Sequence, residues 1–400
     1  MKYILILLIL FSFSGIDLKA QATCTGNVCN TLGPALLGEV NDLGTQFQYQ
    51  YLNKLSKTMG IAGSNANLGS SMIGLGSLNR FEVGGGISAS LYNEGETSVV
   101  YKSTYIDKLP NSGFGITPAI SGGVNLGWLL REGPAHYEYI EEDEEGNVFK
   151  EDEDGDETVP VAPNLLHRIN IYAHGVRYGG NINELKSLKP SEFGISGDFA
   201  VSGWGVNLRF LLIAPDVYSF LFRFMGLSVG VGFNKSLMTL DLSNNKKNNT
   251  QITIGPYIGR WVGDTTMKYD LNARTTTFDI RSGFRLLKVL TFFGGVGYAK
   301  QSTDVVLEFG KKGPLTISVD PSNLYYTAFL NSSVYQNLGS IAAQEGILDV
   351  SDKTYGKYVF GQGFGIFGME INIFSLQIFS EFYFTGYRGG TGNFGVKMSF

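Results

Sequence analysis

Most of the chain beyond residue 78 alternates between apolar and polar side chains with a period of two. From Phe81 to Leu91, apolar or small side chains take every second position, and Glu82, glycines and serines stand between them. The same alternation returns at 206–210, 225–233, 277–286 and 376–384. A period of two indicates a β-strand whose two faces meet different environments. We therefore expect an all-β fold.

Two architectures place one apolar face on each strand: a soluble sandwich, and a membrane barrel whose outer face touches lipid. Several segments alternate over roughly nine residues or more, the length that a tilted membrane strand needs. Strands of soluble proteins are most often about five or six residues long. We expect an antiparallel transmembrane β-barrel over residues 78–400, with an even number of strands, about 12 to 14.

One segment before the barrel has a different period. Apolar residues recur there at spacings of three and four, as on one face of a helix: Leu36, Val40, Leu43, Phe47, Tyr51 and Leu55. Pro34 suits a first helical turn, and Gly60 suits the end of the helix. We expect an amphipathic helix over 34–59, then a linker rich in Gly, Ser and Asn. This helix either sits in the barrel as a plug or lies in the periplasm.

The chain begins with the features of an export signal. Lys2 precedes the apolar run Tyr3–Phe13, and small residues follow it. This run is shorter than the roughly 20 apolar residues of a spanning helix. We expect residues 1–20 to be a signal peptide, with cleavage after 22 as the alternative.

Two cysteines lie just beyond this signal, in the N-terminal segment 21–77. In an exported chain Cys24 and Cys29 most simply form a small disulfide loop. Lipid modification of Cys24 is the alternative. Two thiols are too few to hold zinc.

Composition favours the barrel. The chain has 53 Gly, 28 Phe and 21 Tyr, and only 17% of its residues are charged. Its mean hydropathy of +0.03 is too low for a bundle of membrane helices. A wall that alternates lipid-facing and lumen-facing residues averages to about this value.

The net charge of −5 arises in one segment, since residues 138–157 hold 12 acidic side chains against one lysine. Such a run cannot pack, and we expect a solvated external loop. The alternative is a divalent cation such as calcium at Asp152, Asp154 and Asp156, because clustered carboxylates are hard oxygen ligands. The register of an EF-hand loop fails, since Lys150 would take its first position.

Polar connections are expected to divide by length, with short turns in the periplasm and long loops outside. The expected long loops cover 131–163, 235–248 and much of 300–357. The expected short turns lie near 214–217, 287–288 and 372–375.

If apolar side chains face lipid, the polar residues between them face the lumen. The expected lumen residues are Glu82, Arg168, Asn170, His174, Arg209, Asp279, Arg281, Arg285, Glu381 and Lys397. Charges of both signs inside a barrel usually form an ionic network that holds the wall. An open pore for small solutes is the alternative.

The chain ends on an alternating segment with an aromatic last residue: Phe394, Val396, Met398 and Phe400 carry the apolar positions. This ending resembles the terminal-strand signal of bacterial outer-membrane barrels. The resemblance implies location in the outer membrane, contact with its lipid, and recognition by the barrel assembly machinery.

Two further stretches, 123–130 and 166–175, resemble a leptospiral surface adhesin family. That resemblance implies attachment to host extracellular-matrix proteins. It identifies no binding residue.

Enzyme chemistry has little support, because none of the three histidines has a convincing nucleophile and acid nearby in sequence. Nothing resembles a phosphate loop or a nucleic-acid patch. We expect a non-enzymatic surface protein that needs no cofactor and whose external loops mediate adhesion. The alternative is a passive channel, or a transporter of hydrophobic solutes of the fatty-acid type, through the lumen.

Overall fold

The computed structural model describes residues 21–399 except 72, 76–80, 102–103, 131–140, 143–147, 152–156, 159–164, 185–193, 216–220, 255–256, 288 and 320–344. Within these residues no helix is long and apolar enough to cross a membrane.

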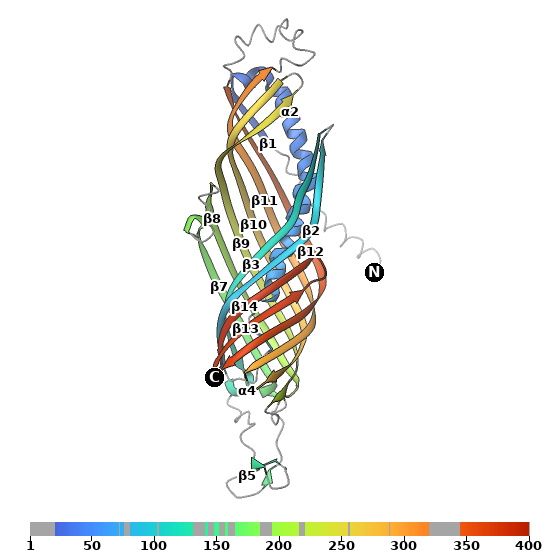
Figure 1. Cartoon of the computed structure of the whole chain (residues 1–400), viewed down its shortest axis with the longest axis vertical. Helices are drawn as coiled ribbons and strands as arrows, with labels where there is room; N and C mark the ends of the chain where they lie inside the picture. Colours follow the sequence, from blue (N-terminus) through green and yellow to red (C-terminus); the bar gives the residue numbers. More distant parts are fainter. Residues whose placement is uncertain are drawn as a thin grey trace, which may run out of the picture.

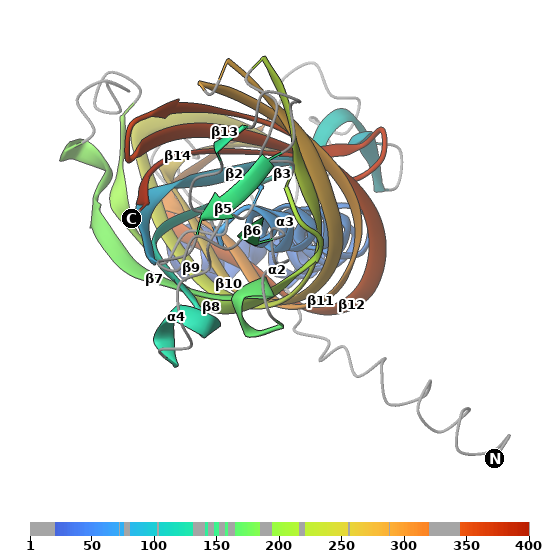
Figure 2. The ribbon, with the colours of Figure 1, turned by 90° about the horizontal axis from the view of Figure 1, so that it is seen from below.

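Ten strands form a closed antiparallel ring in which each strand pairs with the next along the chain (Figures 1 and 2). They are β2 (Phe81–Tyr101), β3 (Thr104–Asn125), β7 (Ile169–Asn181), β8 (Ile195–Ile213), β9 (Phe222–Ile254), β10 (Tyr257–Leu286), β11 (Leu290–Val319), β12 (Glu345–Ile373), β13 (Leu376–Phe384) and β14 (Gly389–Ser399). The last strand closes the ring by pairing with the first, with Met398 opposite Val83.

The predicted antiparallel barrel is confirmed, but the described ring has ten strands rather than 12 to 14. The difference comes from strand length, since β9 to β12 contain 29 to 33 residues each. Two of the predicted long loops are therefore wrong. Residues 235–248 lie in β9, and 300–319 and 345–357 lie in β11 and β12.

The connections separate the two ends of the barrel. The connections at 214–221, 287–289 and 374–375 meet at one end, which we call the turn end. The connection from β3 to β7, which contains the acidic segment, leaves and returns at this same end (Figure 1). If the short turns are periplasmic, as in bacterial barrels, the elements that flank this connection, α4 and η3, are on the periplasmic side too. The expectation of periplasmic short turns and that of an external acidic loop therefore cannot both hold, and most of the acidic segment lies outside the described residues.

Short elements flank or interrupt that connection. They are α4 (Leu126–Leu129), β4 (Glu141–Glu142), β5 (Val148–Glu151), β6 (Glu157–Thr158) and η3 (Leu166–Arg168). A further short turn, η4 (Ile182–Glu184), follows β7 at the opposite end.

The four long strands β9 to β12 continue furthest from the turn end (Figure 1), and we call the part of the wall beyond the level of Lys235 on β9 and Arg274 on β10 the extension. Below this level the outward side chains of β9, β10 and β11 are largely apolar, and those of Phe224, Val231, Phe233, Phe278, Ile280, Phe284, Val296 and Tyr298 are each 37% to 65% exposed. Above it the outward positions carry charge, for example Lys268 and Asp270. The apolar band is the part that faces lipid, and the extension lies in water.

The N-terminal segment lies inside this wall (Figure 2) and runs from the extension towards the turn end (Figure 1). It comprises β1 (Gln21–Gly26), α2 (Asn27–Phe47), the π-helical turn η1 (Gln48–Leu52), α3 (Asn53–Asn65) and η2 (Ala66–Leu68). β1 pairs with β12 in the extension, and α3 contacts β2, β3, β10, β11, β12 and β14. Contacts with strands all around the ring place α3 in the lumen.

The predicted helix end at Gly60 was wrong, because helical structure continues to Leu68. A Cβ on Gly60 would lie 2.9 Å from Val305 Cγ2, and one on Gly63 would collide with Leu271. These glycines are needed for a close approach to the wall, not for a change of direction.

Candidate functional site in the lumen

An ionic network fills the lumen near the turn end. Asp279 Oδ1 accepts hydrogen bonds from Arg209 at 2.6 Å and from Arg281 at 2.9 Å. Arg281 also bonds Glu381 at 2.9 Å. A second group centres on Lys397, whose Nζ lies 3.3 Å from Glu370 and 3.9 Å from Glu82.

All seven side chains of this network are at most 7% exposed. Burying a charge away from water is costly unless an opposite charge and further hydrogen bonds accompany it. Neutral partners supply some of these bonds, since Arg209 donates to Ser228 and Asn393 donates to Glu381. The network therefore ties β2, β8, β10, β12, β13 and β14 together across the lumen.

The N-terminal segment is bound directly to this network. Lys397 Nζ donates to the carbonyl oxygen of Ile73 at 2.9 Å, and Arg281 Nη1 donates to that of Gly74. The backbone N–H of Leu75 donates to Glu370 at 3.1 Å. The end of the segment thus satisfies polar groups of the wall while it occupies the lumen.

Above the network, α3 lies against the wall without space between them. A Cβ on Gly115 of β3 would lie 2.5 Å from the carbonyl oxygen of Ala62, and one on Gly113 would lie 2.3 Å from that of Thr58. Opposite β3, Ser64 donates to Gln301 of β11 at 2.7 Å. Backbone contact on one side and hydrogen bonds on the other fix the helix in place.

The structure brings six of the residues predicted to face the lumen into this network: Glu82, Arg209, Asp279, Arg281, Glu381 and Lys397. Asn170 and His174 are buried on β7 outside it, and Asn170 accepts a hydrogen bond from Asn125. Arg285 bonds Thr291 nearer the turn end.

Arg168 is misplaced by the prediction. It belongs to η3, before β7 begins, and its Nη1 donates to the carbonyl oxygen of Leu212 on an exposed stretch of β8. The alternation that assigned Arg168 to the lumen does not extend into this helical turn.

Sequence reasoning missed Glu370 and Tyr383, whose hydroxyl accepts a hydrogen bond from Arg281 and donates one to Glu381. Glu370 stands on the inward face of β12, where neighbouring inward positions are Phe364 and Ile366. Both faces of that strand are apolar over this stretch, so no alternation between polar and apolar residues shows that Glu370 faces the lumen. The available signal was the lone acid in an apolar run.

The C-terminal residues Phe394, Val396 and Met398 point outward from β14 and are 39% to 57% exposed. Phe400 lies outside the described residues, as do Asp152, Asp154 and Asp156. Among the residues that are described, no group of His, Cys, Asp and Glu could hold a metal ion.

In the extension the inward face becomes apolar. Tyr269 and Leu271 of β10 and Leu307 of β11 are at most 4% exposed and pack against Leu52 and Leu55 of the N-terminal segment. This cluster is a hydrophobic core like that of a water-soluble protein, and it lies beyond the lipid-facing band.

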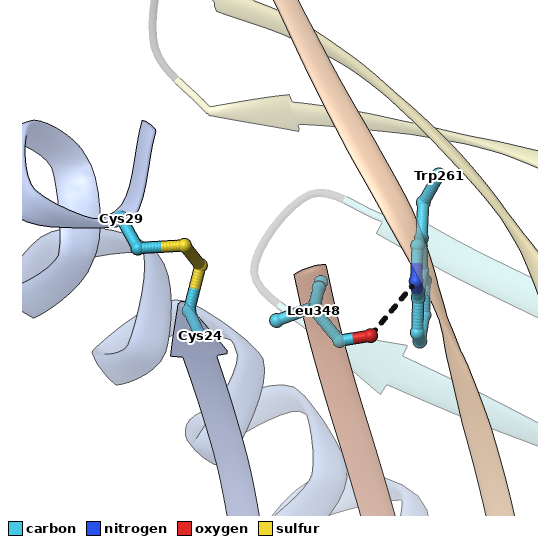
Figure 3. Close-up of a disulfide and its surroundings, with 4 residues drawn as sticks. All are labelled: Cys24, Cys29, Trp261 and Leu348. Carbon is cyan, nitrogen blue, oxygen red and sulfur yellow. Dashed lines mark hydrogen bonds between the residues drawn. A yellow bond between two sulfur atoms is a disulfide. The ribbon is translucent and has the colours of Figure 1, made fainter. Parts of the chain in front are cut away.

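The predicted disulfide is confirmed between Cys24 and Cys29, where β1 pairs with β12 in the extension (Figure 3). It joins β1 to the start of α2 and leaves no thiol on Cys24 for lipid attachment. Beside it, the indole N–H of Trp261 donates to the carbonyl oxygen of Leu348 at 3.2 Å. Val28 and Leu315 complete this small apolar cluster.

Several solved structures match the chain at low similarity. The translocator domain of the autotransporter NalP from Neisseria meningitidis is 7% identical, with 80% of this chain and 89% of that chain covered and a TM-score of 0.27. A Pseudomonas aeruginosa FadL homologue is 8% identical, with 84% and 98% covered and a TM-score of 0.24. The Acinetobacter baumannii outer membrane protein Omp33 is 7% identical, with 80% and 98% covered and a TM-score of 0.22. Such scores carry no inference about function.

No curated protein sequence matches the chain. The closed antiparallel ring and its outward apolar band are those of an outer-membrane β-barrel. A model of the Lsa36-like family, a leptospiral surface adhesin family, matches residues 17–400, and the chain belongs to that family.

Proposed function

We propose that this protein is a non-enzymatic surface adhesin whose barrel is closed to solutes by its own N-terminal segment. The observation that carries the proposal is the occupied lumen. The side chains of Leu52, Ala62 and Ser64 are fully buried inside the wall, and the ionic network fills the space beyond them. A channel or a fatty-acid transporter needs a passage where these residues pack.

The extension supports adhesion rather than transport. Four strands continue well beyond the roughly 9 to 11 residues that cross a membrane. They carry a buried apolar core and a charged outer face into the surroundings of the cell. A rigid projection of this kind presents a large surface and contributes nothing to a pore. Host extracellular-matrix proteins are the proposed partners.

Two measurements on the purified, refolded protein test this proposal. In planar bilayers the wild type is expected to show no stepwise conductance, whereas a variant without residues 27–75 is expected to conduct. Stepwise current from the wild type would overturn the closed-barrel proposal.

Binding to immobilised matrix proteins is tested with two connection variants. In one, a short Gly-Ser linker replaces residues 320–344, which join β11 to β12 at the extension. In the matched control, the same linker replaces 131–164 at the turn end. Adhesion at the extracellular end predicts loss of binding in the first variant alone. Equal binding by both variants and the wild type would contradict it.

The C-terminal strand is proposed to be read by the barrel assembly machinery, since Phe394, Val396 and Met398 all present apolar side chains outward. Replacing Phe400 with Ser is expected to lower the amount of barrel in the outer membrane. Unchanged assembly would refute that role.

A further inference from the structure

Three unpaired cations mark the row where the lipid-facing band meets the extension. Lys235 and Arg274 are direct partners across β9 and β10. Lys300 of β11 lies opposite Thr276, so it is a diagonal neighbour of Arg274. The residues flanking Arg274 and Lys300 are fully buried on the inward face, which directs both cations outward. Together they form what we call the basic row.

Directly opposite residues on neighbouring strands have Cβ atoms about 5 Å apart, and like charges at that spacing repel. None of the three cations forms an ion pair within the described part of the chain. The nearest acid across the sheet is Asp304, a diagonal neighbour of Arg274, and it accepts a hydrogen bond from Tyr355. The repulsion in the basic row is therefore not relieved by the protein itself.

Cations higher on the same face behave differently. Lys268 pairs with Asp241 at 3.6 Å, Lys312 with Asp349 at 3.1 Å, and Lys353 with Glu308 at 3.8 Å. Each of these three cations stands directly opposite its acid on the neighbouring strand. No acid stands directly opposite a cation of the basic row.

Aromatic side chains lie beside the basic row and on its turn-end side. Trp204 is the partner of Lys235 on β8, and its ring lies 5.5 Å from that of Phe233. Phe278 and Tyr298 stand opposite each other on β10 and β11 and are 49% and 55% exposed. A girdle of aromatic rings marks the interface between the apolar core of a membrane and its headgroups. The basic row is thus at headgroup level.

We propose that the basic row binds the phosphate of a lipid headgroup in the outer leaflet of the outer membrane. Three cations on adjacent strands surround one anionic group, and the guanidinium of Arg274 can bind phosphate through two parallel hydrogen bonds. The aromatic girdle packs against the acyl chains of the same lipid. Because the row lies on the side of the band away from the short turns, the leaflet is the external one.

The test uses the full chain refolded in an uncharged detergent. The probe is a bisphosphorylated disaccharide glycolipid of the lipid A type, and native mass spectrometry measures how much stays bound. In the variant Lys235→Gln/Arg274→Gln/Lys300→Gln, affinity is expected to fall roughly 10-fold to 100-fold. The dephosphorylated glycolipid is expected to bind the wild type as weakly as this variant binds the phosphorylated one.

The matched control removes the same charge from the paired cations, as Lys268→Gln/Lys312→Gln/Lys353→Gln. It is expected to retain the glycolipid at the affinity of the wild type. Heat-modifiable gel mobility checks that each variant is folded, and Arg274→Glu alone is the substitute if the triple variant does not fold.

Equal losses in the two triple variants would overturn the proposal, because only net charge would then matter. Equal binding of the dephosphorylated glycolipid would do the same. Tighter binding of a soluble sulfated oligosaccharide than of the glycolipid, at equal ionic strength, would assign the basic row to a soluble ligand instead.

Discussion

Replacing Gly115 with Ala tests whether α3 is seated against β3 as the structure describes. The new Cβ would lie 2.5 Å from the carbonyl oxygen of Ala62 and 2.6 Å from the Cα of Gly63, where ordinary contact begins at 3.4 Å. Both neighbours are backbone atoms, so the whole helix must retreat by about 1 Å. Overpacking of this kind typically costs about 1–3 kcal/mol.

The matched control is Gly365→Ala on β12, where a Cβ meets nothing within 4 Å. Each substitution lowers the entropy of the unfolded chain, worth about 0.4–1 kcal/mol, so the difference between the two variants isolates the contact with the helix. Urea unfolding in lipid vesicles, followed by gel mobility, should show the lower midpoint for Gly115→Ala. Amide exchange of residues 53–65 should also be faster in that variant. Equal midpoints would refute the seating of α3.

Three further predictions concern the ionic network, the N-terminal strand and a buried carboxyl group. Asp279→Asn leaves the buried guanidinium of Arg209 without a carboxylate, while Arg281 keeps only Glu381. It should lower the free energy of unfolding by about 3–5 kcal/mol, whereas Asp241→Asn at an exposed pair should cost less than about 1 kcal/mol; equal losses would contradict the network. An epitope inserted directly before Thr23, which either cleavage site retains, should be labelled on intact cells, because β1 lies in the extension; labelling only after permeabilisation would reverse the topology. Burial raises the pKa of Asp352, in the extension, to about 6. Ionisation of Asp352 costs more in the folded state, so stability falls as the pH rises from about 4 to about 6. Asp352→Asn should therefore be more stable than the wild type at pH 7.5, by about 3 kcal/mol, and the two should converge below about pH 3.

Alternation alone located much of the candidate site. Residues such as Asp279 and Arg281 stand on the same face of one strand as the small inward residues around them, and they were assigned to the lumen from that spacing. Alternation did not show which charges pair with one another across the lumen. Which strands face each other across the lumen depends on the closure of the ring, and a single sequence does not encode that closure locally.

Strand number and loops were misjudged for one physical reason. Polar residues such as Lys235 and Asn248 were interpreted as loop because a membrane strand should be apolar on its outer face. In the extension the outer face meets water, so a strand can continue through lysine, aspartate and asparagine without leaving the sheet. The polarity of the outer face therefore indicates whether that face meets lipid or water, and it does not indicate where the strand ends.

The sequence also did not show how far the N-terminal helical structure continues. Gly60 and Gly63 normally indicate a helix end, since glycine weakens helices by roughly 1 kcal/mol. Here tertiary packing outweighs that propensity, because a Cβ at these two positions would collide with Val305 and Leu271 of the wall. The need for that close approach becomes visible once β10 and β11 are placed around the helix.

The polarity of β10 reverses along its own length. Near the turn end the inward face carries Asp279 and the outward face carries Phe278; in the extension the inward face carries Leu271 and the outward face carries Lys268. A strand in a single solvent would keep one pattern throughout, so the reversal requires two environments outside the wall, lipid and then water. The reversal also requires two kinds of contact inside the lumen, an ionic network near the turn end and an apolar helix face in the extension. Arg274 stands at the point of reversal, which is why this strand fixes the level of the membrane surface on the protein.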